Sequence, residues 1–222
     1  MFKQLDSRIK IDWEFDDGQS MEEDDLVCIL TGATQALLTG ERTALNFLQT
    51  LSGTASKVAE YSQLIRRYPT NILDTRKTIP GLRTAQKYAV ACGGGKNHRM
   101  GLYDAILIKE NHILAAGSIH RAVYEAKQND VPVEVEVESL TELEQAIAAG
   151  ADSVLLDNFD LEMLHEAVNT TQGQVPLEAS GGVDSTTLIE IAKTGVDYVS
   201  IGGLTKHLRA IDFSMRLRSE TH

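Results

Sequence analysis

The sequence predicts an α/β protein whose larger part is an incomplete (β/α) barrel. Six short β-rich runs follow residue 71, and helical patterns separate most of them. Strands that alternate with helices at this spacing form a parallel sheet buried on both faces. Nearly every run ends in a polar or glycine-bearing step, which is where a barrel carries its reacting groups. An open doubly wound sheet also fits, but these endings favour a barrel, and six strands fall short of a complete one.

Apolar spacing and capping signals predict the individual elements. The first 40 residues indicate short strands joined by turns, and residues 39–68 carry apolar side chains at helical spacing. Ser139 and Glu142 form a capping box, and Asp184 is expected to cap a later helix. The barrel strands are expected at 71–77, 104–110, 131–138, 152–158, 175–180 and 197–203, and further helices at 117–129, 139–150, 161–169 and 184–195.

Charge and cysteine content argue against several classes of protein. The 222 residues contain 21 Lys and Arg against 32 Asp and Glu, a formal net charge of −11. Such an acidic chain lacks the broad basic face that general nucleic-acid binding requires. No apolar run is long enough to span a membrane, and the first 18 residues lack the apolar core of a signal peptide. Two cysteines without metal-ligand spacing favour a reducing cytosol.

The cations are nevertheless concentrated in one part of the chain. Seven Lys and Arg residues and two His residues lie between residues 74 and 112, among only three acidic ones. A local basic cluster in an acidic protein predicts a pocket for a small anion. Glycines 93–95 precede His98 and Arg99 and suggest a loop that folds over a ligand, with a solvated charged loop as the alternative. His112 is expected to be structural.

Glycine pairs at the ends of the last two strands predict a phosphate site. Glycine lets backbone N–H groups approach a phosphate closely, and the last two strand–helix loops of a barrel often form such a site. The residues expected there are Ser180, Gly181 and Gly182 after one strand, and Gly202 and Gly203, leading to Lys206 and His207, after the other.

Carboxylates are expected inside the barrel. In the run VEVEVE the valines should face the outer helices, so that Glu134, Glu136 and Glu138 face inward. Buried carboxylates need partners, and the expected ones are Lys77 and Lys109 at neighbouring strand ends. For Glu134 and Glu136 this predicts a structural ion-pair network, whereas Glu138, nearest the strand end, is expected to reach substrate.

Asp157 ends the next strand at the same level as Glu138. Two carboxylates at a cation-rich mouth suit ribose hydroxyls, Mg²⁺ or a developing positive charge. The alternative for Asp157 is a structural one, as the N-cap of the helix at 161–169.

Seven motifs in series resemble one known family. ERTALNFLQTLSGTA, DTRKTIPGLR, KYAVACGGGKNHRMGLYDAILIKENH, EVEVES, LLDNF, EASGGV and SIGGLTKH are similar to those of quinolinate phosphoribosyltransferases, also called nicotinate-nucleotide pyrophosphorylases (carboxylating). The resemblance runs from about residue 36 to the C-terminus. It implies a reaction in which quinolinate and phosphoribosyl pyrophosphate give nicotinate mononucleotide, CO₂ and pyrophosphate, with Mg²⁺ as cofactor. This reaction is a step of NAD biosynthesis. The resemblance also implies that the protein is a cytoplasmic homodimer.

The resemblance also assigns roles to residues. It implies that Lys77, Lys109, Glu138 and Asp157 are catalytic, with Glu138 and Asp157 also near the metal. It implies that the quinolinate and pyrophosphate region is lined by Arg76, His98 and Arg99 beside the two lysines, and that Arg42 reaches into the partner's site. It implies that the ribose 5′-phosphate is held by Ser180, Gly181, Gly182, Gly202, Gly203 and His207.

The front of the chain departs from the family pattern. Family members have a longer N-terminal segment, so this chain is expected to begin inside their N-terminal domain. Residues 1–52, joined by 206–222, are then the remainder of an α+β sandwich domain, and residues 53–205 are the catalytic barrel. Two alternative functions stay open: a related pyridine-acid phosphoribosyltransferase of the molybdenum-operon type, and an inactive phosphate-metabolite binding barrel.

Overall fold

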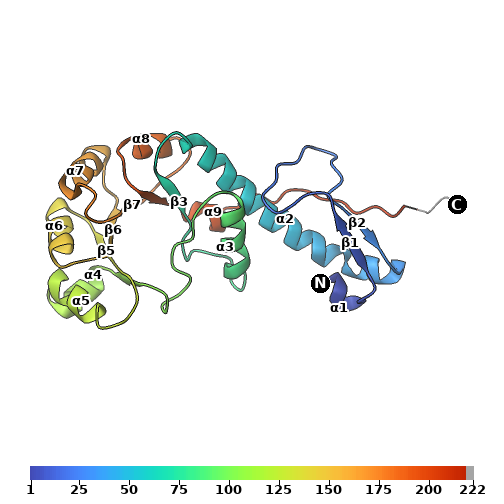
Figure 1. The fold of residues 1–222 in the computed structure, drawn as a ribbon, viewed down its shortest axis with the longest axis horizontal. Helices are drawn as coiled ribbons and strands as arrows, with labels where there is room; N and C mark the ends of the chain where they lie inside the picture. Colours follow the sequence, from blue (N-terminus) through green and yellow to red (C-terminus); the bar gives the residue numbers. More distant parts are fainter. Residues whose placement is uncertain (219–222) are drawn as a thin grey trace.

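The computed structural model describes residues 1–218 and shows an elongated molecule. Figure 1 shows a ring of helices around a curved sheet at one end, and a small two-stranded sheet at the other. The long helix α2 (Thr34–Ile65) connects the two parts. The helix expected at 39–68 is therefore confirmed, although it begins five residues earlier. No helix among residues 1–218 combines the length and apolar character needed to cross a membrane.

The barrel sheet has six strands, and all six match the predicted runs. They are β3 (Asn71–Leu73), β4 (Ile106–Ile108), β5 (Val133–Val137), β6 (Ser153–Asp157), β7 (Leu177–Ser180) and β8 (Tyr198–Ser200). Every pairing is parallel, in the order β3-β8-β7-β6-β5-β4. Strands that follow one another from β4 to β8 are spatial neighbours, and the helices lie outside the ring (Figure 1). This arrangement confirms an incomplete barrel and excludes the doubly wound sheet.

The edge strands β3 and β4 do not pair with each other. The segment after helix α3 (Arg83–Cys92) lies against β3 instead. There Lys96 donates its N–H to Ile72 O at 2.7 Å, accepts from Asp74 N–H at 3.1 Å, and forms a parallel bridge with Leu73. Helix α3 was not predicted from the sequence. This helix and the segment after it cover part of the opening that additional strands would fill in a complete barrel.

The glycines at 93–95 allow close packing and do not form a loop over a ligand. A Cβ at Gly93 would lie 2.3 Å from Ala55 O, and one at Gly95 would lie 2.9 Å from both Val58 and Val90. The glycines therefore end α3 where it packs against α2, and the predicted ligand-covering loop is wrong. The alternative of a solvated charged loop is also wrong for His98 and Arg99, because both side chains are half-buried.

Alternation along the strands separates an outer core from a polar interior. Val133, Val135 and Val137 are fully buried in the main hydrophobic cluster with the outer helices. Glu134 and Glu136 point the other way, where they pair with polar groups inside the ring. The inward glutamates predicted from VEVEVE are confirmed, since adjacent residues of a strand face opposite sides of the sheet.

The outer helices comprise four that the sequence predicted and two short ones, the first and the last, that it did not. They are α4 (Glu110–Ala116), α5 (Ile119–Ala126), α6 (Leu140–Ala148), α7 (Leu161–Thr171), α8 (Leu188–Lys193) and α9 (Gly203–Lys206). Ser139 caps α6 as predicted, by accepting from Glu142 N–H at 3.3 Å. Asp184 is not the N-cap of α8: its carboxylate accepts the N–H groups of Thr186 and Thr187 in the turn before that helix.

The N-terminal part is a small α+β unit on the first turns of α2. It consists of α1 (Phe2–Leu5) and the antiparallel strands β1 (Lys10–Trp13) and β2 (Cys28–Thr31). Phe2, Ile9 and Leu37 form its core. The C-terminal tail runs back along α2 to this core, where Met215 packs. Residues 219–222 of the predicted 206–222 segment lie outside the described residues, and the division into domains at residue 52 stays a prediction.

Candidate active site

The loops after β7, β8 and β3 converge at the mouth of the barrel, because these strands are neighbours in the sheet. Ser180 ends β7, and the exposed Gly181 and Gly182 follow with φ angles of +109° and +59°. L side chains rarely adopt such angles. A Cβ at Gly181 would also lie 2.2 Å from Asn158 Oδ1. The turn therefore presents backbone, not side chains, at the mouth.

The loop after β8 packs against the loop after β3 and is hydrogen-bonded to it. A Cβ at Gly202 would lie 2.9 Å from Lys77 Cδ, so the lysine stem crosses the glycine directly. The hydroxyl of Thr205 donates to Lys77 O at 2.7 Å. Gly202 and Gly203 open α9, and the Lys77 side chain is exposed beside them. Glycine backbone next to an ammonium group suits the binding of a phosphate.

The interior of the barrel holds a histidine between two carboxylates. His98 Nε2 lies 2.7 Å from Glu134 Oε2 and 3.3 Å from Glu178 Oε2. Ser153 donates its hydroxyl to the other oxygen of Glu134 at 3.2 Å. Lys77 and Lys109 were the predicted partners of the inward carboxylates, and Lys77 is wrong, because this exposed lysine lies at the glycine loop. Glu134 pairs with His98 instead, because the segment that carries His98 passes into the barrel after α3.

Burial and the two neighbouring carboxylates shift the pKa of His98 in opposite directions. Burial of the ring lowers the pKa of His98, but the hydrogen bonds and negative charges of Glu134 and Glu178 outweigh it and raise the pKa to about 10. The N–H of Arg99 donates to His98 Nδ1 at 2.9 Å, which favours a ring with its proton on Nε2. In both protonation states Nε2–H therefore points at the carboxylates. Burial raises the pKa of Glu178, which is 3% exposed.

Lys109 pairs with Glu136 inside the mouth, as the sequence predicted. Lys109 is also the N-cap of α4, where His112 Nδ1 accepts from its N–H at 2.9 Å. His112 is therefore structural, as expected. The Lys109 side chain is 44% exposed and Glu136 is 13% exposed. Lys109 thus has one side in the ion pair and the other open to solvent at the mouth.

Glu138 and Asp157 are acidic groups at neighbouring strand ends. The register pairs Val137 with Leu156, so Glu138 and Asp157 follow at the same level. Neither carboxylate is part of an ion pair within residues 1–218. The alternative role of Asp157 as N-cap of α7 is wrong, because Asp160 caps that helix by accepting from Met163 N–H at 2.9 Å. Asp157 Oδ2 accepts from Asn158 Nδ2 at 2.9 Å, and no cation among the described residues neutralises either carboxylate.

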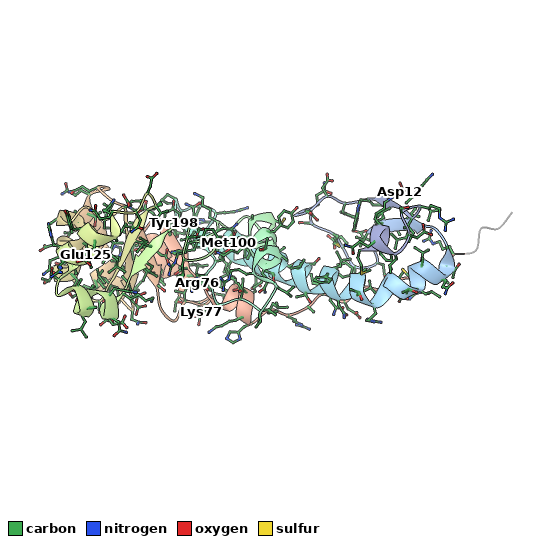
Figure 2. All side chains as sticks on the ribbon, turned by 90° about the horizontal axis from the view of Figure 1, so that it is seen from below. Asp12, Arg76, Lys77, Met100, Glu125 and Tyr198 are labelled. Atoms are coloured by element: carbon green, nitrogen blue, oxygen red, sulfur yellow. The ribbon has the colours of Figure 1, made fainter. Side chains whose placement is uncertain are left out.

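The positively charged side chains of Arg76 and Arg99 lie near each other at the mouth of the barrel. Burial lowers the pKa of Arg99, and the charge of Arg76 lowers it further. Arg99 donates to Ala105 O at 3.2 Å. Arg83 links the segments, since its guanidinium donates to Met100 O at 3.1 Å and Arg76 O at 3.4 Å. Figure 2 shows Arg76, Lys77 and Met100 in this one region. Neighbouring guanidinium groups without paired acids are suited to an anionic ligand.

Comparison with known proteins agrees with this geometry. The family model for the quinolinate phosphoribosyl transferase C-terminal domain matches residues 54–216, and the model for its N-terminal domain matches residues 1–52. The chain belongs to the quinolinate phosphoribosyltransferase family. The resemblance predicted from the motifs is confirmed.

Individual relatives are similar along nearly the whole chain. A probable nicotinate-nucleotide pyrophosphorylase [carboxylating] of Bacillus subtilis is 42% identical over 96% of this chain and 75% of its own length. The solved structure of the nicotinate-nucleotide pyrophosphorylase from Francisella tularensis is 54% identical, with a TM-score of 0.93 over 95% of this chain and 76% of that one. NadC from Streptococcus pyogenes is 44% identical, with a TM-score of 0.93 over 97% and 77%.

Arg42, which was expected to reach a partner's site, and His207 lie away from the mouth of the barrel or at its outside. Arg42 is exposed on the first part of α2, close to Gly40, which packs on Phe2 of the N-terminal unit. His207 is exposed at the end of α9 and makes only a backbone bond to Gly203 there. The other expected residues lie at the barrel mouth or in its interior.

Some buried polar residues were missed from the sequence. Glu178 lies two residues before Ser180 in the run VPLEAS, so both side chains point to the inside of the barrel. This alternation could have identified Glu178 as an interior residue. Asp74 stands at the end of its strand, in the motif DTRK. No sequence signal marks Gln86 and Lys87, which are fully buried on the unpredicted helix α3.

Proposed function

We propose that this enzyme transfers the phosphoribosyl group of phosphoribosyl pyrophosphate to quinolinate with loss of CO₂. The products are nicotinate mononucleotide and pyrophosphate, and the reaction is a step in making NAD. One observation carries the proposal: glycine turns, cations and two carboxylates outside any ion pair of the described residues meet at one barrel mouth. Membership of the family supports it, as do the names of the relatives, which include quinolinate phosphoribosyltransferase [decarboxylating] 1b of Nicotiana tabacum.

The glycine turns are the proposed site for the ribose 5′-phosphate. Backbone N–H groups around Gly181, Gly182 and Gly202 would approach the phosphate without interference from a Cβ. Lys77 crosses Gly202 and supplies an ammonium group to the same site or to the adjacent pyrophosphate. Holding the phosphate here fixes the distance from this anchor to the anomeric carbon, which is the reacting atom. His207 at the end of α9 is the outer residue of this proposed site.

The arginines are the proposed clamp for the two carboxylates of quinolinate. Arg76 and Arg99 present neighbouring positive charges, and Lys109 and His98 lie deeper in the barrel. A clamp that orients the pyridine nitrogen towards the anomeric carbon contributes to rate because the reactants are held in line. After the nitrogen forms its bond, the ring carries a positive charge. Loss of the adjacent carboxylate as CO₂ then leaves the bonding electron pair on the ring carbon as a carbanion that this charge stabilises, and a proton from solvent on that carbon gives nicotinate mononucleotide.

Glu138 and Asp157 fit the requirements of a magnesium site. Mg²⁺ takes oxygen ligands and usually binds through one or two carboxylates, with water and substrate oxygens completing its shell. Two unpaired carboxylates at the same level of adjacent strands provide this donor set. A magnesium ion held there would neutralise charge on the departing pyrophosphate. The carboxylates themselves favour the positive charge that develops on the ribose.

A homodimer with shared sites is part of the proposal. Arg42 is exposed on α2, and the same helix exposes 48% of Phe47 and 49% of Leu38. Large apolar side chains exposed on one helix favour an interface along that helix. In a dimer, Arg42 would enter the partner's mouth and add a cation to the quinolinate clamp. Sedimentation equilibrium tests the dimer, and a monomer at all concentrations would contradict it. The cytoplasm is the proposed compartment, supported by the two cysteines, both free.

The deciding experiment separates the proposed reaction from its alternatives. CO₂ and pyrophosphate release are measured with quinolinate or nicotinate, each with and without phosphoribosyl pyrophosphate, in the presence of Mg²⁺. We expect both products only with quinolinate and phosphoribosyl pyrophosphate together. Pyrophosphate release with nicotinate in place of quinolinate would favour a different pyridine-acid transferase. Ligand binding without turnover would favour the inactive binding barrel.

A further inference from the structure

An ion pair between Asp74 and Lys87 is buried in the barrel wall, and no step of the proposed reaction uses it. Asp74 follows β3, Lys87 lies on α3, and their side chains are 0% and 1% exposed. Burial raises the pKa of Asp74 in spite of the lysine, because removing a charge from water is unfavourable. A buried pair of this kind contributes little net stability compared with apolar side chains of the same size. Stability alone therefore does not explain it.

The pair holds one residue of the site by both of its backbone polar groups. Lys87 Nζ donates to His98 O at 2.7 Å, and His98 N–H donates to Asp74 Oδ1 at 2.9 Å. With its amide oriented to satisfy both acceptors, Asn97 donates to Asp74 Oδ2 at 2.7 Å and to Lys87 O at 2.9 Å. The backbone at residues 97–98 is thus fixed to β3 and α3 through this single ion pair.

The position of this backbone determines where two substrate-facing groups lie. The His98 ring reaches Glu134 and Glu178 inside the barrel, and Arg99 follows with its guanidinium near that of Arg76. Two guanidinium groups repel each other before an anion binds. A rigid backbone is therefore needed to keep them together, and a flexible one would let Arg99 move into solvent.

We propose that Asp74 and Lys87 are positioning residues that pre-organise the quinolinate clamp. They act through the backbone of His98 and touch neither substrate. Their loss should weaken quinolinate binding and leave the binding of phosphoribosyl pyrophosphate unchanged, because no hydrogen bond or ion pair among residues 1–218 joins the glycine turns after β7 and β8 to the pair. The inference rests on the quinolinate reaction proposed above.

The test compares Lys87→Met, Asp74→Asn and the double variant with the unmodified enzyme. We expect the KM for quinolinate to rise about 10- to 100-fold, the range over which a misplaced group changes activity. We expect kcat to fall less, and the Kd of phosphoribosyl pyrophosphate, measured by calorimetry, to stay within about twofold. The double variant removes both charges and should recover most of the lost stability without recovering quinolinate affinity.

A matched control separates positioning from general damage to α3. Ala89→Gly weakens the same buried helix by about 1 kcal/mol but removes no contact to residues 97–99. We expect its quinolinate KM to be normal. A double variant with normal quinolinate KM, or single variants that lose both ligands in parallel, would overturn the inference. If the unmodified enzyme proves inactive on quinolinate, the proposed function fails separately, and calorimetric binding of quinolinate still tests the pair.

Discussion

The interior histidine makes a prediction about stability and pH. His98 lies between Glu134 and Glu178, and its pKa is raised to about 10, from 6.5 for an ordinary histidine. A group whose pKa is raised by folding stabilises the protein fully below the unfolded pKa, and this stabilisation is lost as the pH rises through the folded one. The window for His98 therefore runs from about pH 6.5 to about pH 10.

The magnitude follows from the same shift. Each unit of pKa difference corresponds to about 1.4 kcal/mol, so a ring that titrates near pH 10 contributes at most about 5 kcal/mol. The N–H of Arg99, which faces Nδ1, opposes protonation and reduces this contribution. We expect His98→Gln to remove about 2–4 kcal/mol of the pH-dependent stability, between the value for a neutral hydrogen bond and the upper limit.

The assay is urea unfolding of the unmodified enzyme and of His98→Gln at several pH values from 6 to 10. The difference between their free energies of unfolding should be largest near pH 6 and shrink towards pH 10. Subtraction removes the titration of cysteines and tyrosines, which both proteins share. Parallel curves for the two proteins would refute the reasoning and would mean that His98 is neutral throughout, with its single proton on Nε2.

Three further predictions concern the mouth and its supports. Arg76→Ala should lower kcat/KM for quinolinate by about 10² or more, as the loss of one preorganised donor does; near-normal steady-state kinetics in a folded variant would contradict the role of Arg76 in the clamp. Thr205→Val removes the hydrogen bond to Lys77 O, and should cost about 1 kcal/mol in urea unfolding while raising the KM for phosphoribosyl pyrophosphate several-fold; an unchanged KM would show that this bond does not hold the loop. Gly95→Ala should destabilise by about 1–3 kcal/mol, since the new Cβ would lie 2.9 Å from Val58, with normal KM values if it still folds; selective loss of ligand affinity at unchanged stability would restore the idea of a ligand-covering loop.

Local patterns predicted the elements of this fold well because each pattern has a local cause. Alternation in VEVEVE predicts a strand with valines outside and glutamates inside, and Ser139 lies where its side chain caps the following helix. Helix α3 was missed because its sequence has no strong capping residue: its N-cap, Leu82, has no side-chain hydrogen bond. Asp184 was misplaced because aspartate stabilises turns as readily as it caps helices.

The candidate site was predicted in its residue types but only in part in its pairings. Lys109 and Glu136 pair as expected, since they lie at the same level of adjacent strands. Glu134 pairs with His98, which is 36 residues distant, and nothing in the local sequence reveals that the segment after α3 enters the barrel. Pairing depends on which segment fills a gap in the sheet, and that is a property of the whole fold.

The sequence by itself determined the alternation of strands and helices, the glycine turns at two strand ends, and the family to which the chain belongs. Short-range residue spacing and turn chemistry decide these features, and both can be read directly from the amino-acid sequence. Only the tertiary structure decided that glycines 93–95 pack against a helix, that Asp74 and Lys87 hold the backbone of His98, and that Glu178 faces that histidine. Each of these depends on distances between segments remote in the chain, which are set when the outer helices close around the sheet.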